Sequence, residues 1–306
     1  MSDVNDPNQA SRAGLWARIV FLQVPMAFSA ASLIAAMAIT LGRPLEPAWY
    51  LAAFLGTWCV YLRDSAASCD AEDRISQPGR AALFRASPFL RTTLPAVIAV
   101  AGLATLAWIR PTVPTTVLLI GVGLLGLLHA FSVGNRAASR SEVPSRLQSR
   151  LAILKSPMVS VAWAAAAVSL PVLEGNGPGI STTTWTQATM LGLPLIAVLL
   201  GDSLLLDLRD RDADAQFHLR TIAVRLRPRT VHVIVGALLL IAAVGFGFDS
   251  IAGDTAVSSL AVGIPVVLGL ATAWIAWPSL RNQEASLAMA VMSWRFLAGI
   301  VCFTLA

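Results

Sequence analysis

Charged side chains are scarce in this chain. They make up 13% of its 306 residues, against about 25% in a soluble globular domain. Hydrophobic residues make up 56%, and the mean hydropathy is +0.71. This composition excludes an ordinary soluble domain and predicts an integral membrane protein.

Cysteine, histidine and lysine are also scarce. The three cysteines form no C-x-x-C motif, and the three histidines include no pair at ligand spacing. A disulfide scaffold and a zinc site are therefore excluded. Lysine occurs once, as Lys155, although the chain has 22 basic residues. One isolated lysine among arginines marks that position for attention.

What the sequence has instead is long apolar runs. A membrane-spanning helix needs roughly 20 apolar residues, and nine segments approach that length. We predict an all-α bundle of nine transmembrane helices, with a central cavity that opens to the cytoplasmic side. Residues 1–13 are polar and predicted to be disordered, and 14–306 form a single domain, because no long linker divides them. The predicted spans are 16–41, 47–63, 88–109, 112–133, 152–173, 186–206, 231–248, 257–277 and 286–306.

The basic residues are unevenly distributed among the loops. Most arginines follow the second, fourth and sixth spans, and the alternate loops carry little beyond Arg43 and Arg110. By the positive-inside rule, the arginine-rich loops are cytoplasmic. We expect a multi-pass protein of a bacterial inner membrane. The basic pI then reflects orientation in the bilayer, so no nucleic-acid partner is expected.

The loop after the sixth span carries four carboxylates within eight residues. In a helix, Asp207, Asp210 and Asp214 would lie on one face, and Asp212 would point elsewhere. Such a stripe beside a membrane is costly unless cations bind it. Carboxylates on one face are typical of Mg²⁺ sites that also hold a substrate phosphate. A solvated loop of mixed charge is the alternative.

The loop after the second span occupies an equivalent place, at the cytoplasmic end of an even-numbered span, and it is also acidic. It contains four carboxylates and then Pro78 and Arg80. The acidic residues are Asp64, Asp70, Glu72 and Asp73. Chemistry is thus concentrated on the predicted cytoplasmic face.

Together these features resemble the UbiA superfamily of intramembrane prenyltransferases. Its second motif reads D-x-x-D-x-x-x-D, with a Thr-Leu-x-Val-x-Leu stretch beginning seven residues later. Asp207, Asp210 and Asp214 match the motif, and Thr221-Ile-Ala-Val-Arg-Leu226 follows at that interval. His218 stands where the family usually has glycine. The resemblance implies nine spans and two acidic motifs that face each other across a cavity.

The first motif departs from the family pattern N-D-x-x-D-x-x-x-D. Alignment on Pro78 and Arg80 makes Asp73 its last aspartate, and alignment on Asp64 puts Glu72 there instead. Both registers stay open. Lys155, in Leu154-Lys155-Ser-Pro157, matches a family lysine that contacts diphosphate. The alternative for this lysine is snorkelling at the end of a span.

The resemblance implies Mg²⁺-dependent prenyl transfer from an isoprenyl diphosphate to a lipophilic, aromatic acceptor. The rival hypotheses are a terpene cyclase of the same family and a non-catalytic membrane protein that binds a polyprenyl lipid or a partner. The expected partners are the two substrates and the lipid bilayer, and no obligate protein partner is inferred. The implied catalytic residues are Asp210, Asp214 and Lys155; the substrate-binding residues are Arg80, Lys155, Arg209 and Asp64; the metal ligands are Asp70, Asp73, Asp207, Asp210 and Asp214.

One carboxylate lies inside an apolar run. Asp202 precedes Asp207 by about a turn and a half of helix. An ionised group there should pair with a cation, and Arg295 in the ninth span is the candidate partner. A structural ion pair is the favoured hypothesis, and recognition of an acceptor is the alternative.

Overall fold

The protein is helical throughout the part described by the computed structural model. That part covers residues 14–69, 73–138, 146–177, 180–252, 256–280 and 284–305. The predictions for residues 1–13 and Asp70 lie outside it. The elements are α2 (Leu15–Phe21), α3 (Val24–Thr40), α4 (Pro47–Ser68), α5 (Asp73–Ser76), α6 (Pro78–Ala86), the π-helix η1 (Phe89–Thr93), α7 (Leu94–Ile109), α8 (Val113–Ala138), α9 (Arg146–Glu174), α10 (Thr182–Gln216), α11 (Ile222–Arg225), α12 (Pro228–Ala252), α13 (Ala256–Leu280) and α14 (Glu284–Leu305).

Local sequence explains where several helices begin. Pro47 lies in the first turn of α4, where the missing backbone N–H costs nothing. Ser181 caps α10 by accepting a hydrogen bond from the Thr184 backbone N–H at 3.2 Å, and the Thr184 side chain closes a capping box. Thr221 caps α11 in the same way, through the Val224 N–H.

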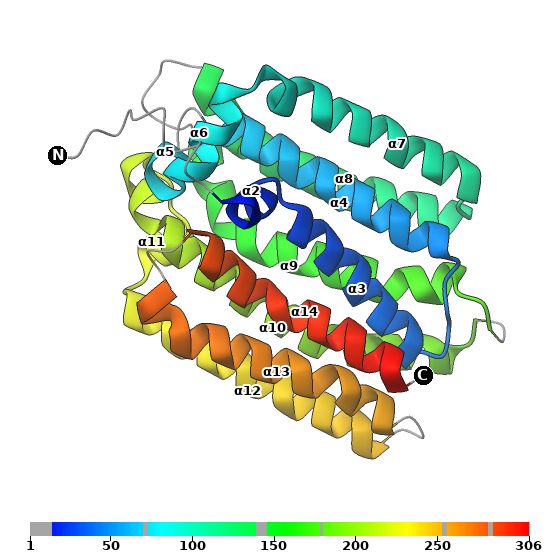
Figure 1. The fold of residues 1–306 in the computed structure, drawn as a ribbon. Helices are drawn as coiled ribbons and strands as arrows, with labels where there is room; N and C mark the ends of the chain where they lie inside the picture. The colour runs from blue at the N-terminus through cyan, green and yellow to red at the C-terminus, as the bar shows by residue number, and fades with distance from the viewer. Residues whose placement is uncertain are drawn as a thin grey trace.

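The long helices form a bundle in which α3 and α9 are central. Figure 1 shows the long helices running side by side, from α7 at one edge of the bundle to α12 and α13 at the other. Helix α3 packs on α4, α9 and α14, and α10 packs on α9 and α12. Helix α4 also packs on α7 and α8. The main apolar core joins α3, α9, α10, α12, α13 and α14.

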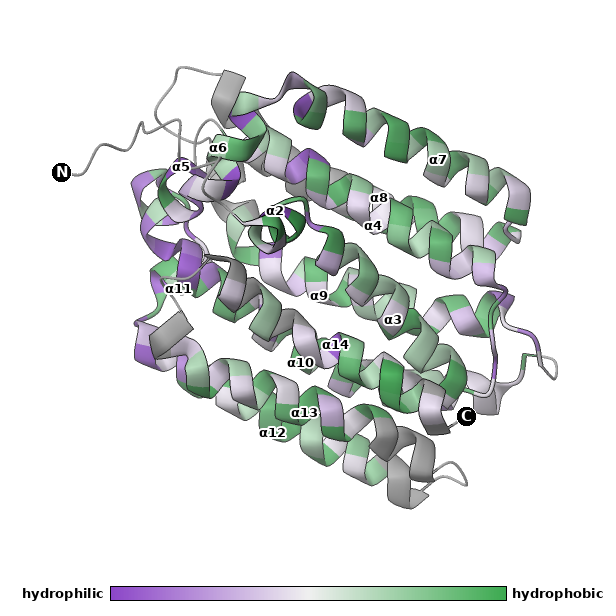
Figure 2. Ribbon diagram, in the orientation of Figure 1, coloured by the Kyte–Doolittle hydropathy of each residue, from purple (hydrophilic) through white to green (hydrophobic). Residues whose placement is uncertain are grey.

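Each of the nine predicted spans corresponds to helical structure in the described residues. Within the described part of the chain, four helices are long and apolar enough to cross a membrane by length and composition. They become five if α2 and α3, which meet at a 63° bend, are one broken span. Figure 2 shows hydrophilic residues gathered where α5, α6 and α11 lie and apolar residues along the long helices. A membrane protein is thus supported, and nine crossings stay a prediction.

Two helices continue beyond their predicted spans. Helix α4 extends to Ser68, and α10 extends to Gln216, so Asp64 and the whole Asp207–Asp214 cluster are helical. No proline or glycine interrupts either extension. Polar residues end a membrane span without ending a helix, so both helices continue past the predicted spans.

Candidate functional site

A cavity of about 460 Å³ lies among α3, α4, α8, α9 and α10, within the size range of small-molecule sites. Its walls are mostly apolar, and charged residues line one end. Three of those are cations and four are carboxylates. They are Arg80, Lys155, Arg209, Asp64, Asp73, Asp207 and Asp210. The structure therefore brings both acidic regions, and the predicted lysine, to one cavity mouth.

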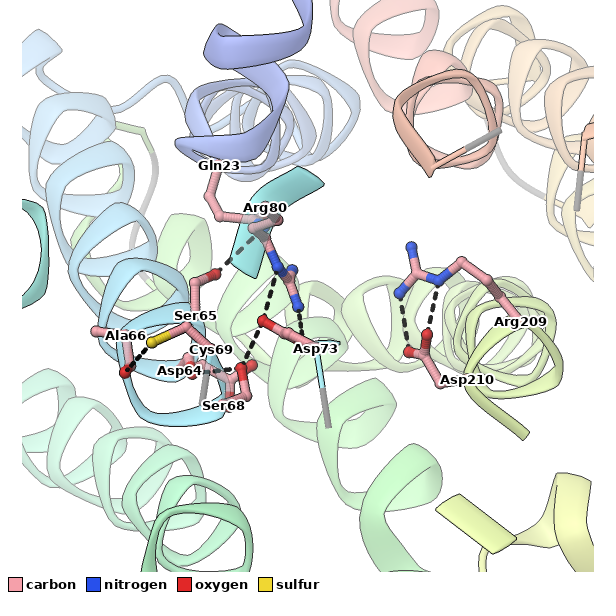
Figure 3. Close-up of polar contacts among 10 residues, drawn as sticks. All are labelled: Gln23, Asp64, Ser65, Ala66, Ser68, Cys69, Asp73, Arg80, Arg209 and Asp210. Carbon is pink, nitrogen blue, oxygen red and sulfur yellow. Dashed lines mark hydrogen bonds and ion pairs between the residues drawn. The ribbon is translucent and has the colours of Figure 1, made fainter. Parts of the chain in front are cut away.

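The first acidic region centres on a buried ion pair between α5 and α6. Arg80 donates from Nε to Asp73 at 3.0 Å and from an amino group to its other oxygen at 2.6 Å. The Ser68 hydroxyl donates to Asp73 at 2.8 Å. Burial alone would lower the pKa of the Arg80 guanidinium, but the adjacent Asp73 carboxylate outweighs it and raises the pKa. Figure 3 shows this cluster beside α4.

Asp64 lies on α4, next to the same cluster. Its backbone carbonyl accepts a hydrogen bond from the Ser68 hydroxyl at 2.9 Å. Within the described residues, its buried side-chain oxygen Oδ1 has no hydrogen-bond partner. One register of the first motif is anchored on Asp64 and the other ends at Asp73. Both aspartates line the mouth.

The second acidic region lies on one continuous stretch of α10. Asp210 receives two hydrogen bonds of 2.8 Å from the neighbouring Arg209, a pair that Figure 3 shows on α10. Asp207 is buried and accepts a hydrogen bond from the Ser156 hydroxyl of α9. Asp212 is exposed, which confirms that it faces away from the other three.

Asp214 lies one turn beyond Asp210 and is fully buried, but it is not among the residues that line the cavity. The helix ends just after it. The Leu219 N–H donates to the Asp214 carbonyl at 2.8 Å, and the His218 N–H donates to the Ala215 carbonyl at 3.1 Å. This is a Schellman motif, whose left-handed position favours glycine. His218 occupies that position with φ of 55°.

Sequence reasoning missed the hydroxyl groups at the mouth. Ser68 holds Asp73, and Ser156 holds Asp207. Ser68 follows Asp64 by one helical turn, and Ser156 directly follows Lys155. These positions are the only available signal, because serines in helices rarely stand out.

The predicted pairing of Asp202 with Arg295 is confirmed. The two side chains approach to 3.0 Å and both are buried. Asp202 also accepts a hydrogen bond of 2.7 Å from the Trp294 indole N–H. The Arg295 guanidinium lies 4.7 Å from the centre of the Trp163 ring, which lines the cavity. Neither Asp202 nor Arg295 is among the residues that line the cavity, so the pair reaches the cavity wall only through Trp163.

The donor set at the mouth fits Mg²⁺ held jointly with a phosphate. Among the described residues, no three carboxylate, imidazole or thiol groups converge to hold a metal by themselves. Mg²⁺ commonly uses only one or two carboxylates, with water and substrate phosphate completing its shell. Four carboxylates against three cations also leave the mouth net negative. A diphosphate would therefore need added cations between itself and these carboxylates.

Comparisons with known proteins do not assign the chain to a family. No family model matches the chain, and no curated protein matches its sequence. One solved structure, described as a digeranylgeranylglyceryl phosphate synthase in membranes, matches over 94% of each chain with 10% identity and a TM-score of 0.49. A likeness at this level carries no inference about reaction or ligand.

Proposed function

We propose that this chain is a membrane-embedded, Mg²⁺-dependent prenyltransferase that moves a prenyl group from an isoprenyl diphosphate to a lipophilic acceptor. One observation carries the proposal: seven charged side chains from α4, α5, α6, α9 and α10 meet at one end of an otherwise apolar cavity. Such a site matches a ligand with a polyanionic head and an apolar tail. The matching second acidic motif adds independent support.

The charged residues would bind and orient the diphosphate. Arg80 and Arg209 each give Nε and one amino group to a carboxylate. In each case this holds the guanidinium in a fixed orientation and leaves its second amino group for a phosphate oxygen. Lys155 lines the same mouth and would contribute a point charge.

Asp207 and Asp210, with Asp64 from the first region, would hold Mg²⁺. Asp70, Asp73 and Asp214 are further predicted ligands. Bound with the diphosphate, the metal supplies Lewis-acid neutralisation of charge on the leaving group. The fixed cations of the chain act on the same developing charge and need no reorganisation.

The reaction would break the allylic C–O bond, with the electron pair leaving on the diphosphate oxygen. The apolar walls would exclude water from the allylic cation, and the aromatic side chains of Tyr61 and Trp163, which line the cavity, could stabilise its charge. The acceptor nucleophile then forms the new bond to carbon. Its proton passes to the released diphosphate, so charge and atoms balance.

We further propose that nine helices span the membrane with the cavity mouth on the cytoplasmic side. The arginine-rich ends of the helices favour this orientation. A cysteine at position 180, in the loop after α9, should react with an impermeant reagent added outside the cell. A cysteine at position 212 should react only after permeabilisation.

The test of function is product analysis. Purified protein in lipid nanodiscs is incubated with Mg²⁺, prenyl diphosphates and a lipophilic aromatic acceptor, and released diphosphate and lipid products are measured. A coupled product supports the transferase. A hydrocarbon or alcohol formed without acceptor supports a terpene cyclase, and binding without turnover supports a lipid-binding protein.

A further inference from the structure

The cavity is deep, and its depth can be read from two helices that line it. On α4, Ser68 and Asp64 line the mouth, and the lining residues continue from Asp64 to Trp49. On α9, they run from Lys155 at the mouth to Leu170. Each pair is fifteen residues apart, and a helix rises about 1.5 Å per residue, so both helices give a depth of about 22 Å.

The lining on each helix forms a single stripe. On α9, residues such as Ser156, Val159, Trp163, Ala166 and Leu170 recur every three or four positions, which is one helical face. Helix α10 contributes only near the mouth, at residues 203–210. The deep part is therefore enclosed mainly by α3, α4, α8 and α9, and no charged residue lines it within the described part of the chain.

Small residues line the cavity partway down, and a large residue lies at its inner end. A Cβ added at Gly56 or at Gly123 would meet no atom within 4 Å, so both glycines border open space. At the inner end, the Trp49 side chain lines the cavity and is only 3% exposed. Leu33, buried in the same core, also lines the cavity.

From this geometry we infer that Trp49 ends the cavity and limits the donor tail to about four isoprene units. An extended chain advances about 1.2 Å per backbone bond, so a unit of four such bonds covers about 5 Å. A depth of about 22 Å then holds about four units. This inference rests on the proposed function, because it assumes that the tail of the donor fills the apolar part of the cavity.

Gly56 provides the sharpest test because it borders the bore partway down. It lies eight residues from Asp64, or about 12 Å along α4, which leaves room for about two units. Gly56→Leu should block the bore at that depth. Gly121→Leu is the matched control: a Cβ at Gly121 also meets nothing within 4 Å, but Gly121 does not line the cavity.

The experiment measures the binding of linear alkyl and prenyl phosphates of increasing length, and donor turnover separately. In the natural protein and in Gly121→Leu, each added unit should tighten binding by at least about tenfold, up to the geranylgeranyl length, because each unit buries about five carbons. In Gly56→Leu the gain should stop near the geranyl length. Trp49→Ala should extend it to longer polyprenyl chains.

Affinity that rises with length in the same way in Gly56→Leu and in the natural protein overturns the inference, even if transfer activity is present. A break in affinity at the expected length without turnover of any donor supports the length limit and rejects the transferase. Failure of every chain to bind rejects both. Failure of Trp49→Ala to fold leaves the decision to the Gly56 and Gly121 variants.

Discussion

The two acidic regions meet at one cavity mouth but differ in how fully their carboxylates are engaged. In the first region, Asp73 accepts three hydrogen bonds, two from Arg80 and one from Ser68. In the second, Asp210 accepts two hydrogen bonds from Arg209. A carboxylate offers about four acceptor sites, so Asp73 has less capacity left for a metal than Asp210.

This difference suggests a division of labour. Under the proposed function, Asp73 would orient Arg80, and Asp207 and Asp210 would hold Mg²⁺. Within the first region, Asp64 would be the better metal ligand, because its buried Oδ1 has no hydrogen-bond partner among the described residues. Acidic residues that look equivalent in sequence would then serve different purposes.

The largest expected effect is in the second region. Asp207→Ala and Asp210→Ala should each lower the rate of Mg²⁺-dependent diphosphate release by on the order of a hundredfold or more. Each variant would lose a ligand of the Mg²⁺ that neutralises the charge on the departing diphosphate. Initial rates of diphosphate release, with folding checked by thermal unfolding, provide the measurement. Asp212→Ala, on the exposed face of the same helix, is the control. Comparable losses in all three variants would contradict the one-face arrangement.

A smaller effect should separate Asp64 from Asp73. Asp64→Asn should raise the Mg²⁺ concentration needed for half-maximal activity by about tenfold or more, since ligand-shell changes commonly cost about 10–100-fold in metal affinity. Asp73→Asn should instead weaken donor binding with little change in that Mg²⁺ requirement. Mg²⁺ titrations of turnover for both variants make the distinction. The reverse pattern would make Asp73 the metal ligand and favour the register anchored on Pro78 and Arg80.

The smallest expected effect concerns the end of the second region. His218 has a left-handed backbone, which costs a residue with a Cβ about 1–2 kcal/mol relative to its preferred conformations. His218→Gly should therefore raise the free energy of unfolding, with activity unchanged. His218→Val should lower it, because a β-branched residue is strained there. Urea unfolding in detergent measures both, and a stabilised valine variant would reject the Schellman geometry.

The features that the sequence predicted well depend on periodicity and on the cost of burying charge. The helical face that contains Asp207 and excludes Asp212 is a matter of spacing, and the Asp202–Arg295 pair arises from the cost of charge in an apolar core. The ends of α4 and α10 lie beyond the predicted spans, because hydropathy marks the membrane boundary and not the end of helical hydrogen bonding. The Asp73–Arg80 pair was also missed, since it depends on how two short helices pack: α5 on α6 and α10, and α6 on α4. No spacing rule connects residues across such a pair of helices.

The central claim is that both acidic regions form one cation-dependent site for a diphosphate. The most direct measurement is the affinity of the purified protein for a geranylgeranyl diphosphate with Mg²⁺ and with a chelator, in the presence and absence of competing inorganic diphosphate. We expect tight binding only with Mg²⁺, and competition by inorganic diphosphate. Equal affinity with Mg²⁺ and with chelator, or no competition, would contradict the claim.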